Sequence, residues 1–405
     1  MQLKLPRGVG YAVGFIIILL LIILGLWAYM GIAGSTGGSS SGGQQGLFGS
    51  LFPFGSGSSS GGSTQNPGEV PGASGPAPTL RKVSDQEVAG AEFATGLGGT
   101  LAIRYVERNT GHIYETPVDS LTLTRLTNTT VPGVHDATWI NASTTLLRFA
   151  DDNDEPENFV AFFASSTPDQ QLEGTFINKY RRIALGAGET VLGVLESASG
   201  ATVETVRSDG TKPKTLLVSP LTTWVPLAAG NKYFVASAPS WAAPGSLYDI
   251  SSSGMTRILG GVPGLVALPS PSAAVFLISG GTQNAVSLSV FNTKDKSLNL
   301  LPRATLAEKC AWIPRQDSIL LCAFPTTLPQ ARYPDDWLLG RVHTSDDLWF
   351  VNTATGVLTE AMALDAGGQG PFDISNVITS ENGAYALFIN RNDQTLWSAT
   401  LSPVQ

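Results

Sequence analysis

The feature that most constrains the fold is a pattern that recurs from residue 79 onward. In most repeats an apolar or Trp residue is followed by a short turn of small or polar residues, and a second apolar run starts seven residues after the first position. The repeats begin at Ala94, Trp139, Ala184, Trp224, Leu268, Trp312 and Ile378. Their spacing is 40 to 45 residues, except for the last, which is 66. A period near 44 with several short strands is typical of propeller blades, which are four-stranded sheets that cannot bury their faces alone.

The seven repeats predict an all-β fold, a seven-bladed β-propeller, with six blades and an appended hairpin as the alternative. Later strands fit the same frame, for example Asp347–Val351, which is followed by a turn that ends at Gly356. The last repeat ends after its third strand, while Thr79–Val83 reads as a spare fourth strand. We therefore expect Thr79–Val83 to pair with the strand around Thr395–Leu401, because this pairing would leave no open sheet edge.

The N-terminal region predicts a membrane helix followed by a linker. Residues 8–33 contain no charged residue, and Lys4 and Arg7 precede them. Such a run is long enough to cross a bilayer, and the positive-inside rule would place Met1 in the cytoplasm. A cleaved signal peptide is the alternative. Residues 34–78 are rich in Gly, Ser and Pro, a composition typical of disordered tethers.

The expected organisation is therefore a cytoplasmic stub with a transmembrane helix (1–33), a tether (34–78) and a propeller domain (79–405) closed by an N-terminal strand. The chain would be a single-pass membrane protein, anchored through residues 8–33, with its propeller in the periplasm or outside the cell. The formal net charge is −8, and only 14% of the residues are charged. This balance argues against a nucleic-acid partner, because phosphate binding needs clustered Lys and Arg.

The segment Asp347–Gly356 (DLWFVNTATG) and the small polar turns after the inner strands resemble TolB-like and WD40-like propeller repeats. The resemblance extends over about residues 79–405. It implies a propeller fold, whereas a TolB-like role in an envelope complex would be an analogy of fold alone. The Gly-His and Trp-Asp dipeptides of strict WD40 blades are missing, as is the small α/β domain that precedes the propeller in TolB.

Few residues suggest catalysis, a cofactor or a metal. The three His residues (His112, His135 and His343) do not lie within ligand spacing of one another or of a Cys. We therefore predict no catalytic residue, no cofactor and no metal site. Cys310 and Cys322 lie symmetrically about a turn, so they should face each other across a hairpin, either as a disulfide or as two buried thiols.

The densest acidic run is Asp151–Glu157, which includes Asp152 and Asp154. Alternating oxygen ligands suggest a Ca²⁺ loop, but Pro156 stands where an EF-hand loop needs Gly. A solvated acidic loop is the other interpretation, since most charge runs are solvated.

Topology predicts which loops share a face. In a blade, the loop between the second and third strands lies on the same face as the connection to the next blade. The acidic run, the segment Pro239–Gly245, the insertion Phe324–Ser345 and the connection Asp365–Asn376 all fall into these positions. Binding concentrates where long loops meet on a rigid scaffold. The predicted binding residues are Trp241, Tyr333, Asp335, Asp336, Trp337, Asp151, Asp152 and Asp154. The alternative for each Trp is that it packs under its own loop.

Two functions follow from this pattern. The first is a non-enzymatic binding or scaffold module of the cell envelope, which would hold a protein, a peptide or a glycan. The second is an extracytoplasmic hydrolase or lyase, whose polar groups would meet in the central channel of the propeller.

Overall fold

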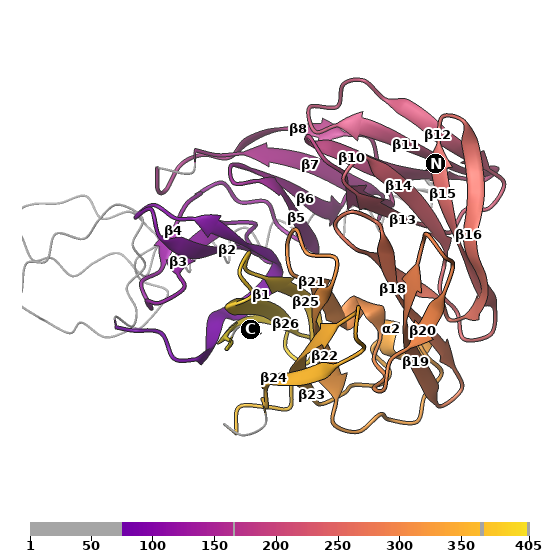
Figure 1. Cartoon of the computed structure of the whole chain (residues 1–405). Helices are drawn as coiled ribbons and strands as arrows, with labels where there is room; N and C mark the ends of the chain where they lie inside the picture. Colours follow the sequence, from indigo (N-terminus) through magenta and orange to yellow (C-terminus); the bar gives the residue numbers. More distant parts are fainter. Residues whose placement is uncertain (1–74, 165–166, 365–367, 403–405) are drawn as a thin grey trace, which may run out of the picture. The chain divides into compact units, whose positions relative to one another are not determined.

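The computed structural model describes residues 75–164, 167–364 and 368–402 (Figure 1). All of them belong to one of the two units of the chain, Thr64–Gln405. Apart from the short helix α2 (Asp335–Leu338) and the 3₁₀ turn η1 (Ala307–Lys309), the regular structure of these residues consists of antiparallel strands. The all-β prediction is confirmed.

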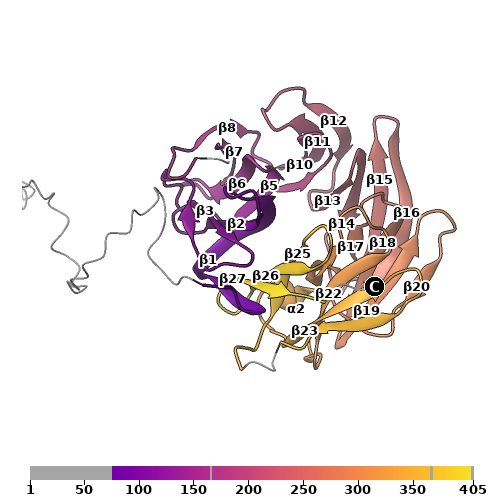
Figure 2. The same cartoon turned by 60° about the vertical axis from the view of Figure 1, so that its left-hand side comes forward.

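Five sheets are separate blades of four strands each, which follow one another along the chain (Figures 1 and 2). Their strands are β5 (Asp136–Asn141), β6 (Thr144–Ala150), β7 (Pro156–Phe162) and β8 (Glu173–Ile177); β9 (Arg182–Leu185), β10 (Thr190–Ser197), β11 (Gly200–Arg207) and β12 (Lys214–Ser219); β13 (Trp224–Ala229), β14 (Lys232–Ser237), β15 (Pro244–Ser251) and β16 (Gly254–Pro263); β17 (Val266–Pro269), β18 (Val275–Thr282), β19 (Ala285–Asn292) and β20 (Leu298–Leu300); and β21 (Cys310–Trp312), β22 (Ile319–Pro325), β23 (Asp346–Asn352) and β24 (Leu358–Met362). The first strand of each blade is the inner one.

The sixth sheet has seven strands, in the order β25-β26-β27-β1-β2-β3-β4. These strands are β25 (Ile374–Thr379), β26 (Tyr385–Asn390), β27 (Thr395–Thr400), β1 (Leu80–Thr95), β2 (Leu101–Glu107), β3 (Ile113–Pro117) and β4 (Thr124–Arg125). The long strand β1 joins the two halves: Leu80 lies opposite Ala399 on β27, and Phe93 lies opposite Ile103 on β2.

The predicted blade count is therefore wrong. The structure has five separate four-stranded blades and one continuous seven-stranded sheet, not seven blades and not six blades with an added hairpin. The physical reason is β1, whose 16 residues pass from one neighbour to the other without a break. The register of β1 shifts between Lys82 and Glu87 and again between Val88 and Gly90. These irregularities turn the strand while it stays within one sheet.

The predicted membrane anchor has no support in the structure. No helix within the described residues is long and apolar enough to cross a membrane. The predicted span over residues 8–33 lies outside those residues, and so does the predicted tether apart from its last residues. At that end Ala77 donates a backbone hydrogen bond to Asp119 (3.0 Å). The single-pass topology and the localisation predicted from it are accordingly not retained.

The core lies between neighbouring sheets, where apolar side chains from the face of one sheet pack on the next. Between the β5–β8 and β9–β12 blades the cluster contains Leu146, Val160, Ile177, Tyr180, Val191 and Val206. Gly193 on β10 lies directly against the Tyr180 ring, so that a Cβ atom there would approach the ring to 2.2 Å. This contact packs the connection between β8 and β9 against β10.

A disulfide joins Cys310 on β21 to Cys322 on β22, which lie directly opposite each other. Both residues are buried in an apolar cluster with Trp312 and Phe324. The bond closes a loop with a sequence separation of 12. Such a loop restricts the unfolded chain, so the bond stabilises the fold by about 2 kcal/mol.

Replacing both cysteines by Ala is expected to lower the free energy of unfolding by about 2 kcal/mol in urea denaturation. A thiol reductant should destabilise the wild-type protein by a similar amount and leave the double variant unchanged. Equal reductant sensitivity of both proteins would contradict this role of the disulfide.

Candidate functional site

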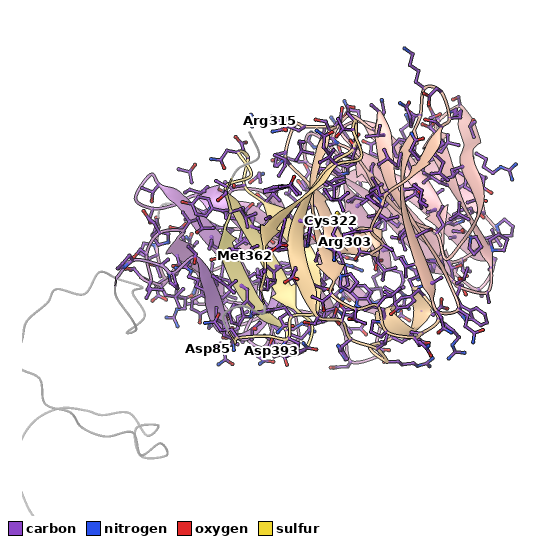
Figure 3. The ribbon with its side chains drawn as sticks, turned by 60° about the horizontal axis from the view of Figure 1, so that its bottom comes forward. Asp85, Arg303, Arg315, Cys322, Met362 and Asp393 are labelled. Carbon is purple, nitrogen blue, oxygen red and sulfur yellow. A yellow bond between two sulfur atoms is a disulfide. The ribbon has the colours of Figure 1, made fainter. Side chains whose placement is uncertain are left out.

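The two ends of the inner strands differ in the loops that they carry. The connections between successive sheets and the loops between second and third strands share one end, which we call the loop face. In Figure 3, Asp85 from strand β1 and Asp393 from the loop between β26 and β27 lie at one end of the molecule, and Arg315 from the loop between β21 and β22 lies at the other. The loop face also carries the longest described insertion, residues 326–345, which contains α2.

The α2 segment binds the neighbouring loop through Asp335. Its Oδ2 accepts a hydrogen bond from the backbone N–H of Trp241 (2.7 Å), and its Oδ1 accepts one from Ser240 Oγ (3.2 Å). Asp336 forms ion pairs with Arg332 and Arg341, both at 3.3 Å. The structure therefore brings the predicted residues Trp241, Asp335 and Asp336 together, but the two carboxylates hold the loops.

Two of the predicted binding residues have buried side chains: Tyr333, which precedes α2, and Trp337, which belongs to it. Tyr333 is 1% exposed and Trp337 is 3% exposed, and both pack against Leu306. They stabilise the loop from below and cannot contact a partner directly. Trp241 on the neighbouring loop is half-buried, so part of its aromatic ring remains available to a partner. The Arg332 guanidinium lies over this ring, 5.8 Å from its centre.

A buried polar network lies under α2. Lys309 Nζ donates to Asp346 Oδ2 (2.6 Å) and Asp373 Oδ1 (2.8 Å). Trp337 Nε1 (2.9 Å) and Thr344 Oγ1 (2.9 Å) also donate to Asp373 Oδ1. Burial raises the pKa of Asp346, and Lys309 offsets this rise only in part. The pKa of Asp373 is lowered instead, because Lys309, Trp337 and Thr344 together outweigh the effect of burial. Through Trp337 the network ties α2 to Asp373, which directly precedes β25, and Lys309 in η1 and Asp346 on β23 complete it.

The acidic run predicted as a binding loop is a turn closed by its own contacts. Asp151 Oδ1 accepts hydrogen bonds from the backbone N–H groups of Asn153 (2.8 Å) and Glu155 (3.0 Å). Lys179 pairs with Asp151 (2.9 Å) and Glu157 (2.8 Å). Its hydrogen bond, together with the two backbone donors, lowers the pKa of Asp151 to about 2. Asp152 and Asp154 are exposed.

A cavity of about 320 Å³, which we call the Glu308 pocket, lies by the inner strands β13 and β17. Its walls are mainly apolar and include Val225, Leu227, Leu265, Val266, Pro239 and, from α2, Leu338. Arg182 and Glu308 are the charged residues that line it. Arg182 is paired with Glu196 (2.5 Å), whereas no described residue forms a hydrogen bond or an ion pair with the Glu308 carboxyl group.

The Glu308 residue is exposed to solvent, yet many protein atoms lie around its carboxyl group. This desolvation raises the pKa of Glu308 to about 7, against the opposing effect of Arg391. A carboxyl group with a pKa near neutral can either donate or accept a hydrogen bond at physiological pH. The pocket thus combines apolar walls with one adaptable polar group.

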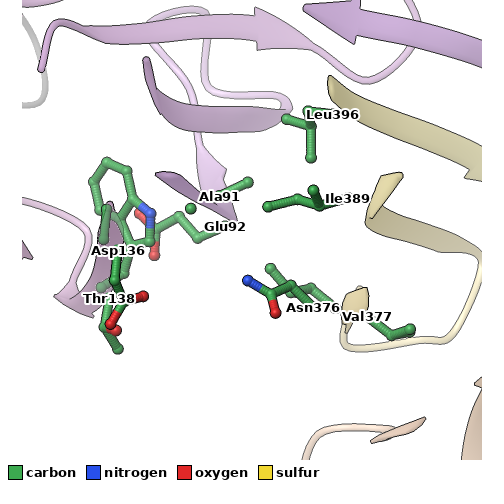
Figure 4. A pocket seen from close by; sticks show the side chains of 12 residues that line it. Ala91, Glu92, Asp136, Thr138, Asn376, Val377, Ile389 and Leu396 are labelled. Carbon is green, nitrogen blue, oxygen red and sulfur yellow. The ribbon is translucent and has the colours of Figure 1, made fainter. Parts of the chain in front are cut away.

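A second cavity of about 380 Å³, which we call the Glu92 pocket, lies among the inner strands β1, β5 and β25 (Figure 4). It shares no lining residue with the Glu308 pocket. Burial raises the pKa of Glu92 to about 8, and the nearby Arg104 only partly opposes this.

Sequence reasoning missed Glu92, Glu308 and the network around Lys309. One signal was available: Glu92 and Glu308 each stand within or beside an apolar inner strand, where a charged residue is unusual. The described residues contain no group of three or more His, Cys, Asp or Glu side chains arranged to hold a metal ion.

No protein-family model and no curated protein sequence matches this chain. Among solved structures, the chain is similar to an oligogalacturonate lyase in complex with manganese (TM-score 0.55, 9% identity, covering 84% of this chain and 99% of that one). It is also similar to the WD40 domain of Neurospora crassa Pan2 (TM-score 0.51, 9% identity, 80% and 97%) and to TolB from Acinetobacter baumannii (TM-score 0.42, 10% identity, 66% and 62%). At these identities the first two similarities show the fold alone: the chain is a β-propeller related in shape to WD40 domains.

Proposed function

We propose that this protein is a non-enzymatic binding module, and that a protein or peptide partner binds its loop face over α2. The observation that carries the proposal is the Glu308 pocket, an apolar cavity that continues onto an exposed apolar surface. Leu338 lines this pocket and is 40% exposed, and the next residue, Leu339, is 62% exposed. Apolar side chains beside a cavity on a rigid scaffold are typical of binding surfaces.

The polar groups around this surface suit a peptide. An apolar side chain of the partner would fill the Glu308 pocket, and Glu308 would form a hydrogen bond with a backbone or side-chain group. Trp241 and Leu339 would cover the mouth of the pocket, while Arg332 and Arg341 supply a charged rim (47% and 60% exposed). An aromatic and aliphatic centre within a polar rim is the usual anatomy of a protein interface.

Site-specific photo-crosslinking in whole cells tests this proposal. A photoreactive amino acid at position 339 is expected to give a discrete cross-linked product. The same amino acid at position 315, on the opposite end of the molecule and 80% exposed in the wild type, should give none. Adding Trp241→Ala and Leu338→Ser to the position-339 protein is expected to lower the yield about tenfold, because each lost contact costs about 1 kcal/mol or more. Equal products at 339 and 315 would reject the loop face as the binding surface.

The two carboxyl groups with near-neutral pKa values favour a second candidate, a hydrolase or lyase. General acid–base catalysis is most efficient when the pKa of the catalytic group lies near the working pH, as it does for Glu308 (about 7) and Glu92 (about 8). A panel of hydrolase and lyase substrates would separate the two functions. Turnover that disappears in Glu308→Gln or Glu92→Gln would favour the enzyme, and no turnover of any substrate is expected from a binding module.

A further inference from the structure

The Glu92 pocket contains an unsatisfied hydrogen-bond acceptor. Glu92 Oε1 is inaccessible to solvent and has no hydrogen-bond partner among the described residues. The nearest cationic side chain, Arg104, directs its Nε to Glu115 Oε2 (2.8 Å) and its Nη2 to the carbonyl of Thr95 (3.1 Å). A buried polar group without a partner costs about 1–3 kcal/mol. A ligand that supplies a donor would recover this free energy once the half-buried Glu92 side chain turns Oε1 toward the cavity.

The other polar groups that line the pocket are Asp136, Thr138, Asn376 and the Trp139 indole, whose Nε1–H is a buried donor without a hydrogen-bond partner among the described residues. Asp136 from β5 faces the same cavity and is paired with Arg148 (2.9 Å). Thr138 and Asn376 add a hydroxyl and an amide, and Figure 4 shows the Asn376 side chain facing the cavity across from Glu92 and Asp136. The twelve lining residues include no Lys and no Arg. This arrangement disfavours an anionic ligand and favours a cationic one.

The remaining walls are apolar. Ala91 and Val377, together with Ile389 and Leu396 from β26 and β27, line the side of the cavity away from Asp136 (Figure 4). A ligand that fits both parts of the cavity carries a compact cation at one end and a short hydrocarbon chain at the other. A primary ammonium group offers three donors and is small enough to approach Glu92 and Asn376 together.

We propose that the Glu92 pocket binds a primary alkylammonium group, with its nitrogen against the Glu92 carboxylate and its alkyl chain against Val377 and Leu396. The group is carried by a free aliphatic amine or by a lysine side chain. This pocket shares no lining residue with the Glu308 pocket, and the proposal does not depend on the proposed function.

Binding should be coupled to the release of a proton. Free Glu92 is largely protonated at pH 7, because burial raises its pKa to about 8, and the ammonium group binds the carboxylate. The charged groups that face Glu92 are Arg104, held by Glu115, and Asp136, held by Arg148. Below pH 8 the affinity should therefore rise up to about tenfold per pH unit, and it should level off above pH 8, until the amine itself loses its charge.

Calorimetric titration of the full chain tests the proposal, with n-pentylamine and Nα-acetyl-lysine amide as probes and n-pentanol as the neutral control. We expect at least one of the two amines to bind more tightly than the alcohol, with tighter binding at pH 8 than at pH 6.5 and with proton release at pH 7. The tighter of the two amines indicates whether the source is a free amine or a lysine side chain.

The variant Glu92→Gln is expected to weaken amine binding at pH 8 at least tenfold and to abolish its pH dependence. The matched control is Glu87→Gln on the same strand, whose side chain is 51% exposed and lies outside the pocket; it should bind as the wild type does. Binding of n-pentanol as tight as that of both amines, absence of amine binding, or unchanged amine binding by Glu92→Gln would each overturn the proposal.

Discussion

Replacing Lys309 by Met is expected to lower the free energy of unfolding by about 3–5 kcal/mol. Lys309 is buried and lies between two buried carboxylates, Asp346 (2.6 Å) and Asp373 (2.8 Å). Removing one partner of a buried ion pair leaves the others uncompensated in a medium that solvates charge poorly. The loss of Lys309 would destabilise the charged form of Asp346 most, because the Oδ1 atom of Asp346 already lacks a hydrogen-bond partner among the described residues. Urea denaturation at pH 7 measures the loss.

The matched control is Lys294→Met, at an exposed position in the turn between β19 and β20. Its effect should stay within about 0.5 kcal/mol. The triple variant Lys309→Met, Asp346→Asn and Asp373→Asn should recover part of the lost stability, because it removes the stranded charges as well. If Lys309→Met behaves like the control, the buried network does not hold the loop face in place.

Replacing Glu92 by Gln is expected to stabilise the protein at pH 8 by on the order of 3 kcal/mol, and to change its stability little at pH 4.5. The folded state raises the pKa of Glu92 from 4.5 to about 8. A raised carboxyl pKa means that the folded state holds a proton that the unfolded state releases. The contribution of Glu92 to wild-type stability therefore falls as the pH rises from 4.5 to 8, and Gln does not titrate.

Urea denaturation of both proteins between pH 4.5 and 9 gives the difference curve. The difference should grow through this window and level off above pH 8. The exposed Glu87→Gln variant should show no comparable slope, since its side chain remains hydrated. If the difference in the free energy of unfolding between wild type and Glu92→Gln does not change with pH, then water or a conformational change hydrates the Glu92 carboxyl group, and its pKa is not raised by burial.

Much of the fold could be predicted from the sequence because each blade repeats the same local pattern. Trp312 and Ile319, for example, mark the strands β21 and β22, and an antiparallel hairpin between them follows from the spacing alone. The blade count could not be predicted in the same way. The sequence pattern separates the strand Thr79–Val83 from the repeat that begins at Ala94. In the structure β1 continues between them, because its residues pair with β27 up to Glu87 and with β2 from Val88 onward.

The candidate site was predictable only in outline. The order of strands in a blade decides which loops share a face, so Trp241 and Asp335 could be expected to lie near each other. The burial of Tyr333 and Trp337 depends on how residues 326–345 fold back, and this contact is long-range: a Cβ atom at Gly281 would lie 2.2 Å from the Tyr333 carbonyl oxygen. The sequence pattern left two interpretations open for Trp337, a binding anchor or a residue packed under its own loop, and the structure buries it with Tyr333 and Leu306 in a small core.

The central claim is that a partner binds the loop face over the Glu308 pocket. Hydrogen–deuterium exchange of the protein, alone and with the partner captured at position 339, tests it most directly. We expect slower exchange in residues 238–243 and 335–341 of the complex, and unchanged exchange in residues 314–318 at the opposite end. Protection confined to residues 314–318 or to the outer strands, with none over α2, would contradict the claim.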